Sequence, residues 1–148
     1  MRSPVHKSRK PSRPVSLHQL FRVLADPTRL RLLHLLDGRE ICVCYFVEIF
    51  GISQPKVSRH LASLRRAGLV AARREGKWMH YRLADQPNEA ASRLLRGILG
   101  ELRQRPEMRR DLERLSAACC APGEYKLPGD APAPVFIAGD AASLSRKP

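Results

Sequence analysis

The sequence lacks long apolar runs and has few aromatic residues. Although 43% of the residues are hydrophobic, only 5% are aromatic, and no stretch approaches the ~18 consecutive apolar residues that a membrane helix needs. No apolar segment of the kind found in secretory signals follows the first residues. These absences argue against a membrane protein or an exported one, so we expect a cytoplasmic location.

Acidic residues are also scarce, with 14 Asp and Glu against 27 Lys and Arg and a formal net charge of +13. A basic excess of this size favours nucleic acid or an anionic membrane surface as a partner. The excess is local, because residues 54–82 contain eight Lys and Arg but one acid, whereas residues 15–53 contain four of each sign. One basic segment on an otherwise balanced domain favours a nucleic-acid surface over an evenly solvated one.

Cysteine is rare and occurs as two tight pairs, Cys42/Cys44 and Cys119/Cys120. In a secreted protein an even number would suggest disulfides. Cysteines this close in sequence bridge poorly to each other, and the chain shows no export signal. We therefore expect the thiols to bind a metal or metalloid, or to carry thiol chemistry.

Three regions differ in composition. Residues 1–14 are predicted to be a disordered basic arm, residues 15–118 a folded domain, and residues 119–148 a Cys-Cys element followed by a flexible tail rich in Ala, Pro and Gly. Within the domain, apolar residues at helical spacing predict helices over 17–24, from Pro27 to Gly38, over 43–50 and from Ser53 to Gly68. Two further helices are predicted over 94–102 and 108–115, on either side of Pro106.

The periodicity changes between these helices. Residues 69–74 and 77–83 are predicted to be short strands around the turn Glu75-Gly76. Two short helices joined by Gly51-Ile52-Ser53 predict a helix-turn-helix, and the hairpin that follows predicts a wing. The expected fold class is mainly α with a small β-hairpin, a winged helix-turn-helix.

In such a fold the start of the second helix faces base edges in the major groove of double-stranded operator DNA. Gln pairs with adenine and Arg with guanine, while Lys, Ser and His suit phosphates or bases. The adjoining basic hairpin suits backbone and minor-groove contacts. The predicted DNA-binding residues are Gln54, Lys56, Ser58, Arg59 and His60 in the helix and Arg73, Arg74 and Lys77 in the wing.

One helix-turn-helix unit binds weakly, and dimers gain from two half-sites. The apolar stripe Leu94, Leu95, Ile98, Leu99 and Leu102 follows an already complete small domain. We therefore expect a homodimer built on this stripe together with the helix over 17–24. Packing of the stripe inside its own subunit is the alternative.

Several segments together resemble the ArsR family of metal- and metalloid-responsive repressors. They are residues 24–30 (LADPTRL), 40–44 (EICVC), 53–61 (SQPKVSRHL), 68–70 (GLV) and 76–83 (GKWMHYRL). The resemblance covers about residues 17–118. It implies a winged-helix dimer that represses its operon and is released by ligand, and Cys-Val-Cys looks like the element of the arsenite- and antimonite-sensing branch.

Three departures from the patterns of the family's branches stand out. Enteric-type arsenite sensors have a third cysteine where this chain has Val47. The family's zinc site on the helix after the wing is missing, because residues 86–105 contain no His. Cadmium and lead sensors add N-terminal cysteines, and residues 1–41 contain none.

As(III) and Sb(III) are soft and favour thiolate sulfur, so we expect one of them as inducer and no required cofactor. Cys42 and Cys44 supply two sulfurs, and Cys119 or Cys120 of the same or the partner subunit supplies a third. Residues two apart on an ideal helix face nearly opposite directions, so joint ligation is expected to distort the helix start and displace the recognition helix. A helix N-terminus should also favour the thiolate.

Other interpretations stay open. Cys119 and Cys120 alone suffice for a methylated arsenical, unless Cys119 is a core residue that continues the Met108, Leu112 and Leu115 stripe. A repressor that senses oxidants or persulfides through a disulfide is the main rival. A small thiol oxidoreductase is disfavoured, because the chain has no Cys-x-x-Cys near a βαβ pattern and no phosphate-binding glycine loop; we expect no enzyme. A passive nucleoid-type DNA protein would ignore both sequence and ligand.

Overall fold

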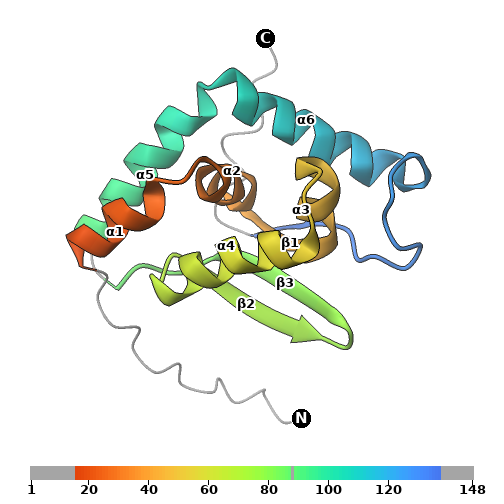
Figure 1. Ribbon diagram of the computed structural model, residues 1–148. Helices are drawn as coiled ribbons and strands as arrows, with labels where there is room; N and C mark the ends of the chain where they lie inside the picture. Colours follow the sequence, from red (N-terminus) through yellow and green to blue (C-terminus); the bar gives the residue numbers. More distant parts are fainter. Residues whose placement is uncertain (1–15, 88, 138–148) are drawn as a thin grey trace, which may run out of the picture.

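The computed structural model describes residues 16–87 and 89–137, so the predicted arm (1–14) and the end of the predicted tail (138–148) lie outside the described residues. Six α-helices and a small antiparallel sheet, whose β2–β3 hairpin lies at one edge of the molecule, make up this part of the chain (Figure 1). The helices are α1 (Leu17–Leu24), α2 (Pro27–Leu36), α3 (Val43–Phe50), α4 (Gln54–Arg66), α5 (Glu89–Arg103) and α6 (Pro106–Cys120). The strands are β1 (Arg39–Cys42), β2 (Val70–Glu75), β3 (Trp78–Leu83) and β4 (Val135–Phe136), and a 3₁₀ turn covers Pro122–Glu124.

The helix boundaries follow the predicted capping residues. The Asp26 carboxylate accepts a hydrogen bond from the backbone N–H of Arg29 at 2.9 Å, and Pro27 begins α2. Ser53 occupies the N-cap of α4, but its side chain makes no capping hydrogen bond. Gly51 ends α3 with a φ of 63°, a left-handed conformation that favours glycine. This turn between α3 and α4 confirms the predicted helix-turn-helix.

The hydrophobic core is centred on α2, which packs against α4, α5 and α6. Four of its five leucines, Leu32, Leu33, Leu35 and Leu36, are fully buried, as is Phe46 of α3. Figure 1 shows α5 and α6 on one side of α2 and the β2–β3 hairpin on the other. The core therefore holds the helix-turn-helix and the wing in one unit. None of the helices in the described ranges is long and apolar enough to cross a membrane.

The sheet is larger than the predicted hairpin. Its strand order is β2-β3-β1-β4, with every pair antiparallel. The predicted hairpin is confirmed, and Gly76 takes a φ of 57° in its turn. Strand β1 was not predicted, and it places Ile41 opposite Tyr81 and Cys42 opposite His80.

The prediction of a flexible tail directly after residue 120 is wrong for its first part. Residues 122–137, which we call the C-terminal strap, return to the sheet, where β4 pairs with β1. The backbone N–H of Ile137 donates to the carbonyl of Gly38 at 3.0 Å, and the Arg39 guanidinium lies 5.7 Å from the centre of the Phe136 ring. The composition of the segment is that of a loop, but backbone pairing to β1 and contacts of Tyr125, Leu127 and Ala131 with the core give it a fixed path.

Candidate nucleic-acid interface and thiol pair

Helix α4 presents the side chains expected to contact DNA. Its apolar residues Val57, Leu61 and Leu64 are fully buried, so the opposite face is left to solvent. Gln54, Lys56 and Arg59 are exposed in the first two turns of the helix. The predicted reading positions at the helix start are thus available to a groove.

Two of the predicted residues on α4, Ser58 and His60, do not simply face solvent. Ser58 is half-buried and lines a hollow of about 350 Å³ between α4 and Tyr81 of β3. The ring of His60 turns toward the start of α2, where its Nδ1 lies 3.5 Å from Oδ1 of Asp26. Asp26 already caps α2, so His60 faces a structural carboxylate. This contact makes His60 a weaker candidate for a base contact than Arg59.

The wing carries three predicted cations, and Arg73 is already paired. Its guanidinium contacts the carboxylates of Glu40 in β1 and Glu75 in β2, each at 2.6 Å. These two hydrogen-bonded partners raise the pKa of Arg73, and Arg73 lowers the pKa of Glu75. Arg73 therefore ties the wing to β1, and two acids compensate its charge.

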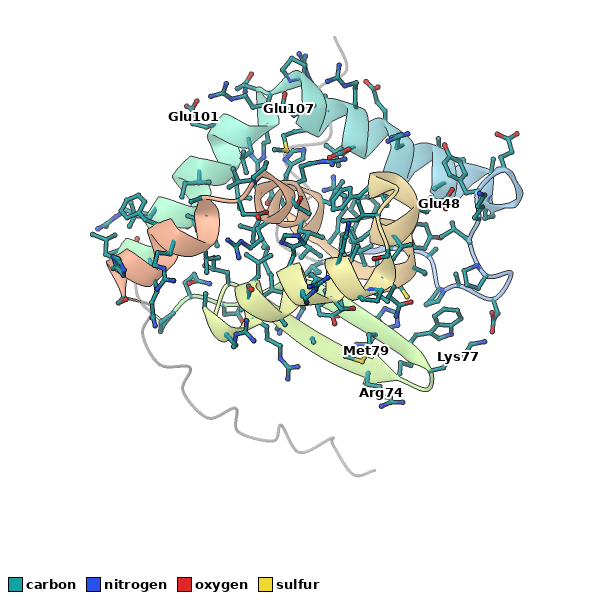
Figure 2. All side chains as sticks on the ribbon, viewed as in Figure 1. Glu48, Arg74, Lys77, Met79, Glu101 and Glu107 are labelled. Atoms are coloured by element: carbon teal, nitrogen blue, oxygen red, sulfur yellow. The ribbon has the colours of Figure 1, made fainter. Side chains whose placement is uncertain are left out.

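Lys77 and Arg74 lie at the tip of the wing, at the end far from α5 and α6 (Figure 2). The Lys77 ammonium lies 2.6 Å from Oδ2 of Asp130 in the C-terminal strap and 4.7 Å from the centre of the Trp78 ring. That contact lowers the pKa of Asp130. Nε of Arg74 donates to the carbonyl of Gly76 at 3.0 Å. Within the described ranges, Arg74 is the predicted wing cation that has no carboxylate partner.

Sequence reasoning missed cations at the other end of α4. Arg65 and Arg66 are exposed in its last turn. The signal was in the sequence, because Arg66 follows Arg59 by seven residues, which places both on one helical face.

The first cysteine pair is formed by the junction of β1 and α3. Cys42 is the last residue of β1 and the N-cap of α3, with an extended φ/ψ of −70° and 143°, while Cys44 lies in the first turn of α3. The two Sγ atoms are 3.2 Å apart. The expectation that joint ligation must distort the helix start is wrong, because Cys42 is outside the helix and the sulfurs already lie side by side.

This junction also favours ionisation of one thiol. The Cys44 thiol donates a hydrogen bond to Cys42 Sγ, and backbone N–H groups of Val43, Cys44 and Met79 support the same sulfur. Together they overcome the opposing effect of burial and lower the pKa of Cys42 from 9.0 to about 7. The same hydrogen bond raises the pKa of Cys44. The pair thus holds one thiolate and one thiol near neutral pH, as a helix N-terminus favours.

The second cysteine pair differs from the first in its position, its exposure and its pKa shift. Cys119 and Cys120 are the last two residues of α6, and both are exposed. The buried stripe of α6 passes through Ala118, so Cys119 is not the core residue that one interpretation allowed. Burial of part of the side chain and the neighbouring Cys120 raise the pKa of Cys119, and Arg39 opposes them.

The structure does not gather the two pairs into one cluster. Tyr45 of α3 lies within electrostatic range of both, since its pKa is raised by burial first and then by Cys119, Cys44 and Cys42. Nevertheless, in residues 16–87 and 89–137 no three His, Cys, Asp or Glu side chains lie close enough together to share a metal ion. A third sulfur from the same subunit is therefore not in place beside Cys42 and Cys44.

The predicted dimer stripe on α5 is divided. Leu95, Leu99 and Leu102 are buried within the subunit, so the stripe does not form an interface as a whole. Leu94 is 44% exposed, and with Leu30 and Ile98 it lines an apolar groove of about 710 Å³. On α1 the division is similar, because Leu20 and Leu24 are buried while Leu17 and Phe21 are 57% and 60% exposed.

Comparison with known proteins assigns the helix-turn-helix to a family. Residues 26–72 match the family described as "Bacterial regulatory protein, arsR family". The arsenical resistance operon repressor of Escherichia coli K12 is 54% identical over 67 residues, which are 45% of this chain and 57% of the repressor. The HTH-type transcriptional regulator CmtR of Mycobacterium bovis is 46% identical over 96 residues, which are 62% of this chain and 72% of CmtR. The match thus spans little more than half of the Escherichia coli repressor.

A solved structure supports the fold. The homodimeric winged helix-turn-helix DNA-binding domain (fragment 1–100) of a possible ArsR-family transcriptional regulator from Mycobacterium bovis, determined by solution NMR, has a TM-score of 0.50 and 29% sequence identity. The match covers 61% of this chain and 81% of that domain. The fold and the family are those of transcriptional regulators and not of enzymes. This chain is therefore a winged helix-turn-helix protein that belongs to the ArsR family.

Proposed function

We propose that this protein is a cytoplasmic, dimeric repressor that binds operator DNA through α4 and the wing and is released when trivalent arsenic or antimony binds the thiolates of Cys42 and Cys44. The observation that carries the proposal is the 3.2 Å contact between the two sulfurs at the junction of β1 and α3. This junction is joined directly to both parts of the proposed DNA-binding surface.

The DNA contacts follow from exposure and charge. Gln54 and Arg59 are the side chains suited to base edges, and Lys56 and Arg74 supply exposed positive charge beside them. Ser58 and His60 take smaller roles because both are half-buried. Arg73 and Lys77 contribute fully only if DNA phosphates replace their carboxylate partners.

A homodimer supplies the second half-site. The exposed apolar side chains Leu17, Phe21 and Leu94 offer surface for a second copy of the chain, and the groove beside Leu94 is apolar. The similar domain from Mycobacterium bovis is homodimeric. Two copies place two α4 helices on successive major grooves, which multiplies the affinity of a single unit.

The thiol pair fits a soft trivalent ion. With bonds of about 2.3 Å, typical of metal–thiolate sites, two sulfurs on one atom are about 3.3 Å apart for a right-angled geometry and about 3.8 Å for a tetrahedral one. The observed 3.2 Å therefore favours the narrow angle of a pyramidal centre. The third position is left to Cys119 or Cys120 of the partner subunit, to a thiol from solution or, for a methylated arsenical, to the methyl group.

The switch acts through β1 and α3. Strand β1 pairs with β3 of the wing, where Cys42 lies opposite His80, and Glu40 of the same strand holds Arg73 of the wing. Helix α3 packs against α4 and joins it through the Gly51 turn. An ion bound to both sulfurs replaces the hydrogen bond between Cys44 and Cys42 and joins β1 to α3, so it acts on the wing and on the recognition helix at once, and the coupling between ligand and DNA must be reciprocal.

The test is a titration of the DNA upstream of its own gene at fixed salt, with arsenite, antimonite, methylarsenite, Cd(II) and Zn(II) added separately. We expect sequence-specific binding without ligand and release by arsenite and antimonite. The matched control is Cys44→Ser, which removes the pair without touching the DNA surface and should bind DNA but resist release. Failure of the wild-type protein to bind this DNA, or release of the variant at the wild-type arsenite concentration, would refute the proposal.

The same sulfur contact favours a second candidate, a repressor that senses oxidants. The Cys42 thiolate attacks peroxide, the O–O bond breaks, and a sulfenic acid and hydroxide form. The Cys44 thiol then displaces the new hydroxyl group as water, which leaves a disulfide. Release by peroxide that a dithiol reductant reverses, with no effect of arsenite, would select this alternative.

A further inference from the structure

Three arginines converge on one cleft that neither the thiol pair nor the start of α4 uses. Arg22 of α1, Arg29 of α2 and Arg66 of α4 line a cleft of about 370 Å³ together with Gln19 and Ser63. No carboxylate belongs to its lining in the described ranges. The cleft is formed by segments that are far apart in the sequence, so sequence reasoning did not find it.

The hydrogen bonds made by the guanidinium groups of Arg29 and Arg66 go to neutral partners. Nη2 of Arg29 donates to the carbonyl of Arg22, and Nη2 of Arg66 to Oγ of Ser63, each at 3.4 Å. Nε of Arg29 is buried and has no hydrogen-bond partner within residues 16–87 and 89–137. Unmet donors of this kind are costly unless a ligand satisfies them.

Other arginines of the same chain show what a paired guanidinium looks like. Arg31, Arg73 and Arg103 each contact a carboxylate at 2.6 to 2.7 Å. None of the ion pairs between described residues involves an arginine of the cleft. The arginines of the cleft thus lack the carboxylate partners that Arg31, Arg73 and Arg103 have.

The cleft opens beside the proposed DNA-reading face. Arg66 lies seven residues after Arg59, on the same face of α4 and about 10.5 Å further along the helix axis. The major groove is about 12 Å wide. When the start of α4 enters the groove, its last turn therefore reaches the sugar–phosphate strand that borders the groove.

We propose that this arginine cleft binds a backbone phosphate of operator DNA next to the major groove that α4 occupies. Arginine offers a fork of donors that matches the oxygens of a phosphate, and three guanidiniums satisfy them together. A phosphate contact fixes the register of the recognition helix but carries no sequence information. The inference rests on the proposed DNA binding and adds a contact outside the helix start and the wing.

Salt dependence measures this contact. Binding of the wild-type protein, Arg22→Gln and Arg66→Gln is compared on the DNA upstream of its own gene and on a duplex of arbitrary sequence. The matched control Arg109→Gln removes the same charge from the exposed surface of α6. Complete loss of the contact lowers the slope of log affinity against log salt by about 0.9 per phosphate, so by about 1.8 in a dimer. Because three guanidiniums share the phosphate, we expect each cleft variant to lose a part of this slope, equally on both DNAs.

A second experiment distinguishes binding of a DNA phosphate from binding of free phosphate. Neutral methylphosphonates replace individual phosphates beside the bound groove, and inorganic phosphate is tested for binding without DNA. We expect one neutral position that weakens the wild-type protein but does not further weaken Arg66→Gln. Slopes equal to that of Arg109→Gln, or binding of inorganic phosphate at the cleft without any effect on the slope, would overturn the inference while DNA binding itself stands. A wild-type protein that binds neither DNA refutes the proposed function instead.

Discussion

The two cysteine pairs of this protein have nearly the same spacing in sequence but different surroundings. Cys42 is completely buried, and its sulfur lies 3.2 Å from that of Cys44, whereas Cys119 and Cys120 are exposed at the end of α6. The first pair spans a change from strand to helix, which turns both sulfurs to one side. The second pair lies within one helix, where neighbours point about 100° apart. A binding site is therefore made by backbone geometry, and the presence of two thiols is not sufficient.

The electrostatic surroundings also favour a thiolate in the first pair more than in the second. Backbone N–H groups at the start of α3 and the Cys44 thiol stabilise the Cys42 thiolate. At the end of α6, burial of part of the side chain and the neighbouring Cys120 raise the pKa of Cys119. The first pair is prepared for a soft electrophile at neutral pH, and the second is not.

The largest expected effect is a loss of stability when the ion pair that attaches α6, the helix that carries Cys119 and Cys120, is broken. Asp111 of α6 receives two hydrogen bonds of 2.7 Å from Arg31, whose guanidinium also lies 4.2 Å from the centre of the Phe50 ring. Asp111→Ala leaves Arg31 unpaired and partly buried, which should cost about 3 kcal/mol of unfolding free energy. Urea denaturation measures it.

The control for this prediction is Arg103→Gln, which breaks the more exposed pair with Asp37 and should cost less than about 1 kcal/mol. Equal losses in the two variants would contradict the view that the buried pair fixes α6. In Asp111→Ala, the rate of alkylation of Cys119 should change more than the arsenite concentration needed for release. The reason is that Cys42 and Cys44 lie on β1 and α3 and not on α6.

The next largest effect concerns the first pair itself. Cys42→Ser removes one arm of a two-armed ligand, so the arsenite concentration needed for release should rise about a hundredfold or more, the usual gain from joining two weak contacts. Affinity for DNA without arsenite should stay within about twofold, because Cys42 is buried and lies outside α4 and the wing. A release curve identical to that of the wild type would show that the sulfur contact is not the sensor.

The ionisation of Cys42 predicts a dependence of stability on pH. The pKa of Cys42 is about 7 in the native state and 9.0 in the unfolded state. Between these pH values the unfolded state binds more protons, so the free energy of unfolding rises with pH. We expect a gain of about 2 kcal/mol from pH 7 to 9 under reducing conditions. Above pH 9 the raised pKa of Cys44 acts in the opposite direction, so stability should fall again.

Urea denaturation of the wild type and of Cys42→Ser at pH 7, 8 and 9 isolates the contribution of the Cys42–Cys44 pair, because titrating groups outside the pair cancel in the difference. A gain that is the same in both proteins would mean that the thiolate is no better stabilised in the native state than in the unfolded one.

The smallest effect is expected at the second pair. Replacing both Cys119 and Cys120 by Ser should change the arsenite concentration for release by less than about twofold, which is within ordinary variation for exposed substitutions. A much larger change would mean that the partner subunit supplies a third sulfur to Cys42 and Cys44. Repeating the titration with methylarsenite then shows whether the third sulfur matters only for the inorganic ion.

Several parts of this architecture follow from the sequence and several do not. Apolar spacing and capping residues such as Asp26 and Gly51 place the helices, because these signals act within a few residues. Strand β1 was missed because four residues show no clear alternation and become a strand only when β3 lies beside them. Strand β4 is shorter still, and its pairing with β1 spans about a hundred residues of chain.

The sequence by itself determined the order of helices and wing, the basic character of 54–82 and the presence of two thiol pairs, because local periodicity, capping and charge decide these features. Only the tertiary structure decided which thiols lie together, which cations remain free of acids, and that Arg22, Arg29 and Arg66 share a cleft. The reason is that these features depend on partners far apart in the chain, such as Arg31 and Asp111, which are 80 residues apart. A pattern of residue types identifies a face of a helix or strand, but it does not specify what that face will meet.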